Sequence, residues 1–372
     1  MNVNNVLPHL HKELLHGMYF DYDDTSTKFL DIITITTSLF LFAPEIKKGQ
    51  KDLSITIPVF HYSVWEKEKA AAEAFFSWMT DTHVSLQFTN NIPPDTEEGF
   101  LLSLPAYQNI ALFYDDIESI AGINHQLVCD YIRIPNKNNE KTKQQKLAAF
   151  LRKTASDSSE IINIDIKLLN KRKSKTTPAA ISLVLAIAAA KAYFNGGTKV
   201  YYYQSQKIDA DSLNLAKTAH PKTYQLLNAL YQCISADMQI ETPLLHKTRI
   251  TVLKEMPKEH KLQIKNTNEC LRMKRKTALA AANTPCGICT ACFQRKIALA
   301  AANSEVYDGF YQYDYGQKIA EITDEHDQQI YRDTLELMET LSQERKTTEE
   351  DEYLADDLRS AFACFVDRYN PY

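Results

Sequence analysis

Four cysteines near the carboxy-terminal end are the residues whose spacing most clearly suggests chemistry. Cys286, Cys289 and Cys292 follow one another in the segment CGICTAC, and Cys270 lies a loop's length upstream. A C-x-x-C turn lets two sulfurs converge on one ion, Gly287 eases the backbone of that turn, and zinc prefers four thiolates in a tetrahedron. Because four such ligands close the coordination sphere, the pattern predicts a structural zinc ion.

Other uses of these thiols stay open. A redox C-x-x-C would need no third and fourth cysteine, whereas an iron–sulfur cluster could use all four. A zinc module that grips nucleic acid is suggested by the basic run LRMKRK at 271–276 and by Arg295 and Lys296, but the net charge of -5 makes nucleic acid the weaker partner. The remaining cysteines are expected to be small buried apolar residues: Cys129, Cys233 and Cys364.

The two common kinds of phosphate-binding loop are absent from the sequence. The chain has nine glycines, and neither G-x-x-x-x-G-K-[ST] nor G-x-G-x-x-G occurs in it. In open α/β sheets a ligand lies beyond the carboxyl ends of the strands. The turn at 114–119, which follows the apolar run NIALF at 109–113, is therefore the place where a nucleotide would bind.

An alternation of strands and helices positions that turn. Apolar, β-like runs lie at 109–113, 127–134, 160–166 and 198–204, and helical patterns lie at 141–154 and from Pro178 onward. Gly196 and Gly197 resemble the stop of the second helix. Strands that alternate with helices of this length predict a parallel sheet covered on both faces.

The amino-terminal part predicts a smaller α/β unit. Between about 28 and 92, β-like runs at 31–42, 53–60 and 84–89 accompany one helical stretch at 65–79. Two consecutive prolines, at 93 and 94, then mark a boundary. We therefore divide the chain into an accessory α/β domain (1–100), a main domain that contains the cysteines (101–300) and an acidic helical tail (301–372).

Composition and hydropathy favour a cytoplasmic protein without a membrane segment. The 372 residues are 44% hydrophobic and 24% charged, which is ordinary for a folded chain of two domains. The apolar stretches 29–44 and 178–194 are shorter than the roughly 20 residues that a bilayer requires, and Asp31 and Lys191 interrupt them. The first residues lack the apolar run of a signal peptide.

The segment CGICTACFQRKIAL, with Cys270 upstream, resembles the carboxy-terminal zinc motif of the 7-cyano-7-deazaguanine synthase (QueC) family, in which an arginine-containing helix follows the cysteines. Arg295 occupies that later position. Three further segments resemble the family in the same order: NKRKSK with Arg172 and Ser174, AKTAHPKTY with His220 and Pro221, and PLLHKTRITVL with Lys247 and Thr248. The last of these resembles the family's P-x-x-x-x-T-K-x-x-[IV]-V.

The amino-terminal segments FLDIITITTSLFLFA, LSITIPVFHYSVWE and FFSWMTDTHVSLQF resemble the extra domain of QueC-like proteins in bacterial anti-phage cassettes, the QatC-like type. The resemblance implies an adenine-nucleotide alpha-hydrolase-like fold, which is the Rossmann-like parallel sheet of a PP-loop ATPase. It also implies an amino-terminal α/β extension and a carboxy-terminal zinc-binding helical region.

In the active family, a loop S-G-G-x-D-S after the first strand holds ATP, and the substrate carboxylate is adenylated, amidated and dehydrated to a nitrile. The loop is degenerate here, because Tyr114, Asp115, Asp116, Glu118 and Ser119 occupy its positions and only the serine is kept. Replacing the glycines adds side chains and negative charge where backbone N–H groups would approach the pyrophosphate. A carboxylate about 4 Å from a phosphate charge costs about 4 kcal/mol near a protein surface.

We therefore expect no tight ATP binding in the family manner. Asp115, Asp116 and Glu118 could instead hold Mg²⁺, which would reverse the sign of the local field. Three solvated acids on a turn are the favoured interpretation.

Three hypotheses of function follow. The first is a non-catalytic or altered QueC-like subunit, which binds partner proteins of an anti-phage system or a 7-deazaguanine-like small molecule. The second is an active ATP-dependent ligase that adenylates a 7-deazaguanine carboxylate and forms an amide or nitrile. The third is a zinc-containing nucleic-acid-binding protein. For the second, the resemblance implies these catalytic residues: Ser119, Arg172, His220 and Lys247.

Overall fold

The computed structural model describes most of the chain. The described residues are 24–46, 50–91, 108–124, 127–135, 139–163, 178–206, 216–234, 237–270, 272, 284–343 and 349–372. Arg172, Ser174 and most of the LRMKRK run lie outside the described residues.

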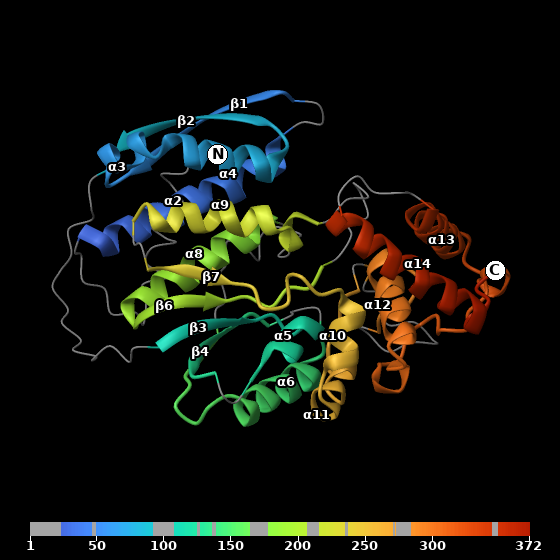
Figure 1. Ribbon diagram of the computed structural model, residues 1–372. Helices are drawn as coiled ribbons and strands as arrows, with labels where there is room; N and C mark the ends of the chain where they lie inside the picture. The colour runs from blue at the N-terminus through green and yellow to red at the C-terminus, as the bar shows by residue number, and fades with distance from the viewer. Residues whose placement is uncertain are drawn as a thin grey trace.

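A five-stranded parallel sheet forms the centre of the protein (Figure 1). The strand order is β5-β4-β3-β6-β7, and the strands are β3 (Gln108–Phe113), β4 (Cys129–Arg133), β5 (Ile161–Asn163), β6 (Gly196–Tyr201) and β7 (Gln239–Glu241). Every neighbouring pair in this sheet is parallel, as the alternation of strands and helices predicted. The short strand β7 was not predicted.

Alternate side chains of the central strand β3 enter two hydrophobic cores. Ile110 and Leu112 lie in the core that contains α8 (Pro178–Phe194), whereas Ala111 and Phe113 lie in the core that contains α5 (Ile117–Gly122) and α6 (Lys141–Thr154). Helices therefore cover both faces of the sheet, as expected for parallel strands. Gly196, at a φ of 73°, follows α8 at the predicted helix stop.

The amino-terminal unit contains a helix where the sequence predicted a strand. Residues 31–42 belong to α2 (Asp24–Phe42), which packs along α8. β-branched residues favour strands, but this run is buried on every side, so tertiary packing decides its conformation. The backbone tolerates the hydroxyls because they bond to the preceding turn, as Thr36 Oγ1 does to the carbonyl of Ile32 at 2.9 Å.

The rest of this unit agrees with the predicted α/β pattern. It comprises β1 (Asp52–Val59), α3 (Tyr62–Lys67), α4 (Lys69–Thr80) and β2 (His83–Asn90). The two strands pair in parallel as a separate two-stranded sheet. Helix α4 packs against α9 (Pro221–Gln232), so the unit lies on the α8–α9 face of the larger sheet (Figure 1).

One helix among the described residues is long and apolar enough to cross a membrane. It covers 27–45, and 78% of that window is buried inside the protein. Asp31, within it, is fully buried and accepts hydrogen bonds from the backbone N–H of Phe60 (2.7 Å) and from Trp65 Nε1 (2.9 Å). A charged residue with all its partners in the protein is typical of a core helix.

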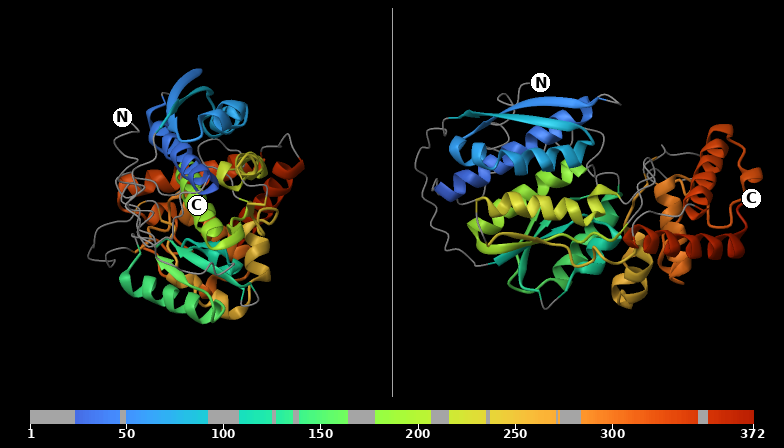
Figure 2. Two further views of the ribbon diagram at one scale, coloured as in Figure 1. Left: turned by 90° about the vertical axis from the view of Figure 1, so that its left-hand side faces the viewer. Right: turned by 45° about the horizontal axis from the view of Figure 1, so that its top comes forward.

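The carboxy-terminal helices form a lobe beside the sheet (Figure 2). Helix α12 (Thr290–Ala301) packs against α14 (Glu349–Tyr369), and α14 packs against α13 (Glu325–Gln343). The ring of Phe293 in α12 lies 5.7 Å from Tyr331 and 5.0 Å from Phe365. The predicted helices of the tail are confirmed, and they are docked on the cysteine-bearing helix.

Short helical turns connect these elements. They are α10 (Arg249–Glu255), α11 (Lys258–Lys261), η2 (Ala43–Glu45), η3 (Lys217–Ala219), η4 (Ile264–Asn266), η5 (Glu305–Tyr307) and η6 (Ile319–Glu321).

Candidate metal centre and the loop after the first strand

The four predicted cysteines converge on one point. The ligand atoms of Cys270, Cys286, Cys289 and Cys292 all lie within 4.8 Å of one another, and the sulfurs of the first two are 3.6 Å apart. Gly287 has a φ of 84°, and a Cβ there would lie 2.0 Å from the carbonyl oxygen of Tyr313. The turn therefore requires glycine both for its left-handed backbone and for space.

The thiols are buried, and their mutual hydrogen bonds shift their pKa values in opposite directions, upward for Cys270 and Cys292 and downward for Cys289. The backbone N–H of Cys286 points to the sulfur of Cys270 at 3.3 Å, and that of Cys289 points to the sulfur of Cys286 at 3.4 Å. Hydrogen bonds from the neighbouring thiols, that of Cys270 first, lower the pKa of Cys289 far below its usual value. Four buried, converging sulfurs, with backbone N–H donors to those of Cys270 and Cys286, fit a structural zinc ion held by all four.

A buried lysine lies beside this centre. Lys296 is 0% exposed, and its Nζ donates to the carbonyl oxygens of Tyr313 (2.7 Å) and Asp314 (2.9 Å). Burial lowers its pKa to about 8, and the nearby Cys292 sulfur raises it in part. A cation here would offset part of the net negative charge that four thiolates leave around a divalent metal.

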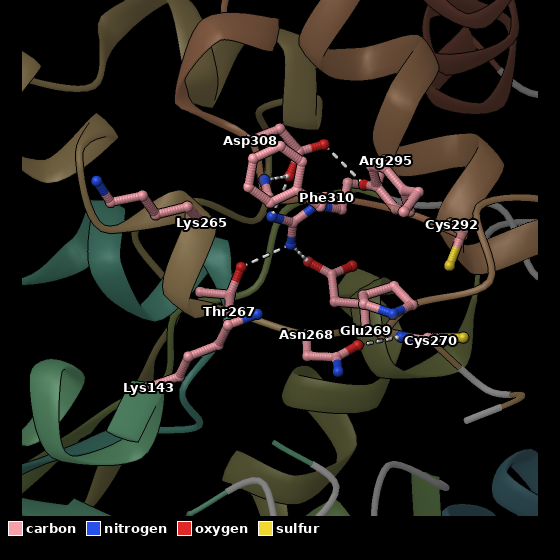
Figure 3. A pocket seen from close by; sticks show the side chains of 13 residues that line it. Lys143, Lys265, Thr267, Asn268, Glu269, Cys270, Cys292, Arg295, Asp308 and Phe310 are labelled. Carbon is pink, nitrogen blue, oxygen red and sulfur yellow. Dashed lines mark hydrogen bonds and ion pairs between the residues drawn. The ribbon is translucent and has the colours of Figure 1, made fainter. Parts of the chain in front are cut away.

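The side chain of Arg295 is also buried and bonded to neighbouring residues. Its guanidinium donates to Asp308 Oδ1 at 2.7 Å from Nη2 and to Thr267 Oγ1 at 2.6 Å (Figure 3). It also donates to the carbonyl oxygen of Ile264 at 2.8 Å. Both residues are less than 5% exposed, and both side chains are hydrogen-bonded to neighbouring loops. The suggestion that Arg295 and Lys296 bind nucleic acid is therefore wrong.

The acidic loop after β3 is buried and paired rather than solvated. Asp115 is 1% exposed, and its carboxylate forms a bidentate ion pair with Arg133, with N–O distances of 2.9 and 2.7 Å. Its φ of 55° is left-handed, the conformation that the family's glycine would adopt without cost. The favoured interpretation of three solvated acids is wrong, because Arg133 at the end of β4 reaches this carboxylate.

A second buried carboxylate of the loop has its own arginine. Glu118 accepts from Arg249 Nε at 2.8 Å and Nη2 at 3.0 Å, and from Ser205 Oγ at 2.7 Å. The third guanidinium nitrogen of Arg249, Nη1, donates to Glu269 Oε2 at 2.6 Å. Glu269 directly precedes Cys270, so a chain of ion pairs joins the loop to the metal centre.

The third acid of the loop begins a helix. Asp116 Oδ1 accepts from the backbone N–H of Ser119 at 2.8 Å, and Ser119 Oγ accepts from the N–H of Tyr114 at 3.0 Å. Burial, with a contribution from Glu118, raises the pKa of Asp116 to about 7. Because arginines already hold the other two carboxylates, the three acids do not form a Mg²⁺ site.

Two of the remaining predicted catalytic residues, His220 and Lys247, make contacts with residues outside this loop. His220 begins α9, where its Nδ1 accepts from the N–H of Lys222, and its ring lies 4.7 Å from that of Trp78. Lys247 pairs with Glu255 at 2.5 Å near the surface. Within the described residues Ser119 shares no hydrogen bond with either.

Two arginines at the loop were missed by the sequence reasoning. In the family pattern P-x-x-x-x-T-K, counting from Pro243 places Thr248 at the threonine and Arg249, not Lys247, at the lysine. That spacing could have identified Arg249. Arg133 had no comparable signal, because it stands at the end of an otherwise apolar strand.

The fold and the cysteine centre define the class of protein: a parallel-sheet α/β protein of the PP-loop type with a carboxy-terminal cluster of four cysteines that could hold a metal ion. Residues 121–303 match the sequence model of the family described as queuosine biosynthesis protein QueC. This part of the chain is therefore QueC-like. The matched region begins just beyond the loop at 114–119 and includes all four cysteines. No curated protein matches the chain.

Proposed function

We propose that this QueC-like chain is a non-catalytic subunit of a bacterial anti-phage defence system, and that it binds partner proteins instead of turning over ATP. The observation that carries the proposal is the pair of buried ion pairs in the loop, Asp115 with Arg133 and Glu118 with Arg249. Two carboxylates occupy the positions where the family's loop would leave room for phosphates.

The energetics disfavour a nucleotide at this place. An incoming triphosphate would have to separate two buried, bidentate ion pairs. Leaving one of these charges without its partner costs about 3–5 kcal/mol of folding free energy. It would also meet the carboxylates themselves, at a repulsion of about 4 kcal/mol for each charge pair 4 Å apart. The loop is better explained as an internally neutralised structural turn.

The defence role rests on the amino-terminal unit. The segments that resemble the accessory domain of anti-phage QueC-like proteins form α2, β1, α3, α4 and β2, and they pack on α8 and α9 of the main sheet. A unit attached through a shared hydrophobic core would hold a partner in a fixed orientation to the QueC-like part.

The active-ligase alternative makes a different prediction for two surface residues. If the chain only binds partners, replacing His220 and Lys247 together with alanine should leave protection against phage unchanged, within about threefold in plating efficiency. Both side chains are partly exposed and neither lies in a core, so the variant should fold. The measurement is phage plating on cells that carry the chain with its neighbouring genes.

A matched variant at the loop separates folding from chemistry. Ser119→Ala removes a hydroxyl that accepts one backbone hydrogen bond and should also keep protection. Loss of protection in either variant, with unchanged protein level and melting temperature, would favour the ligase. Protection that is absent even with the unaltered chain and its neighbours would refute the defence role.

A further inference from the structure

One face of the protein is strongly basic although the whole chain is acidic. Helix α6 carries five basic residues and no acid: Lys141, Lys143, Lys146, Arg152 and Lys153. The segment from α11 through η4 adds three lysines and one glutamate: Lys258, Lys261, Lys265 and Glu259. With eight basic residues and one acid, the two segments together carry a net charge of +7, against -5 for the chain.

These two segments lie side by side. Helix α6 packs against η4, the ring of Phe150 in α6 lies 5.1 Å from that of His260 in α11, and Asn139 Nδ2 donates to the carbonyl of Asn266 at 2.5 Å. Figure 1 shows α6 and α11 next to each other on the same side of the molecule. Their charges therefore lie on two adjoining segments, 141–154 and 258–266, which we together call the basic face.

The negative charge of the chain is concentrated elsewhere. Helix α13 carries five acids and one arginine, and α14 carries seven acids and two arginines, so that the two helices together have a net charge of -9. Both helices belong to the carboxy-terminal lobe. The overall charge of -5 thus hides an uneven distribution, and it is a poor guide to what the basic face attracts.

An exposed aromatic ring borders the basic face. Phe310 is 92% exposed, and it lines a hollow together with Lys143 and Lys265 (Figure 3). Neither lysine has an ion-pair partner in the part of the chain that the structure describes. An exposed ring beside two ammonium groups offers a ligand a stacking surface and positive charge at the same place.

The loop that carries this ring is firmly anchored. The carboxylate of Asp308 accepts from Arg295, from the N–H of Gly309 at 2.8 Å, and from the hydroxyls of Tyr311 at 2.7 Å and Tyr315 at 2.8 Å. Burial alone would raise the pKa of Asp308, but Arg295 and these donors hold it below its usual value. The exposure of Phe310 is therefore built into a rigid loop.

We propose that the basic face with Phe310 binds single-stranded nucleic acid, with the lysines on phosphates and the ring of Phe310 stacked on a base. Ammonium groups bind phosphates without regard to sequence, and a free aromatic face accepts any base. The acids nearest the hollow, Glu269 and Asp308, are paired with Arg249 and Arg295, so they do not repel a phosphate chain. An acidic protein would use the lysines but has less need of an isolated, rigid ring.

Fluorescence anisotropy with a labelled oligonucleotide of about 12 nucleotides tests this, using the full chain between about 50 and 200 mM salt. Binding should weaken steeply with salt. Replacing Lys143 and Lys265 with glutamine should weaken it at every salt concentration and lower the slope of log K against log salt by about 1.4, because two phosphate contacts are lost. Lys51→Gln, an exposed lysine on the amino-terminal unit, is the matched control and should change nothing.

The ring is tested separately. Phe310→Leu should weaken binding roughly tenfold at constant salt slope, since stacking is lost and charge is not, whereas Phe310→Tyr should bind like the original chain. Absence of binding at low salt would overturn the proposal. So would displacement of the oligonucleotide by poly-L-glutamate combined with an unchanged affinity of Phe310→Leu, which would identify the surface as a site for acidic protein.

Discussion

Cys289→Ser should abolish stable metal binding and lower the melting temperature by at least about 10 °C, because the free energy of metal binding at a four-thiolate site is folding free energy. Cys289 is 5% exposed and begins α12, the helix on which α14 packs. Losing the metal would remove the ion that ties Cys270 to the CGICTAC turn, and with it the cross-link beneath both helices. The measurement is zinc content by plasma mass spectrometry, with the melting curve followed by circular dichroism.

The matched control is Cys364→Ser on α14. Cys364 is half-buried and lies outside the group of four, so this variant should retain its zinc and its melting temperature. A strong chelator should reproduce the effect of Cys289→Ser on the unaltered chain. Full zinc content in Cys289→Ser, or a melting curve indifferent to metal, would show that the cluster does not hold a structural ion.

Arg249→Ala should destabilise the protein by about 3–5 kcal/mol, because it removes the partner of a buried carboxylate. Glu118 is 1% exposed, and the arginine supplies two of its hydrogen bonds, at 2.8 and 3.0 Å, beside the one from the hydroxyl of Ser205. Glu269 would lose its 2.6 Å contact, and among the described residues its other ion-pair partner, Arg295, is 3.6 Å away. Urea unfolding followed by circular dichroism measures the free energy of unfolding.

Lys247→Ala is the matched control, since it stands two positions earlier and removes only a surface ion pair with Glu255. It should cost less than about 1 kcal/mol. Adding Glu118→Gln to Arg249→Ala should recover part of the loss, because a neutral amide is cheaper to bury than a charge. Equal effects of the two alanine variants would contradict the described role of Arg249.

Much of the architecture could be predicted from the sequence, because it depends on local patterns. Apolar runs separated by helices predicted the parallel strands, and C-x-x-C spacing predicted the cysteine cluster. Helix α2 was mispredicted because β-branched residues dominate it, and only burial on all sides, a property of the assembled fold, makes it helical.

The ion pairs at the loop could not be predicted in the same way. Whether Asp115 is solvated or buried depends on which residue stands at the end of the neighbouring strand, and that became visible only with the register of β3 and β4. Arg249 is an intermediate case, since its position in the family pattern could have indicated it, but its bond to Glu118 depends on how α10 packs against α5.

The most direct test of the central claim, that the loop's own carboxylates exclude a nucleotide, is isothermal titration of the zinc-loaded chain with ATP and Mg²⁺. The account predicts no heat beyond dilution, and no pyrophosphate release when a 7-deazaguanine carboxylate is added. Micromolar ATP binding accompanied by pyrophosphate release would contradict it and identify the chain as an active ligase.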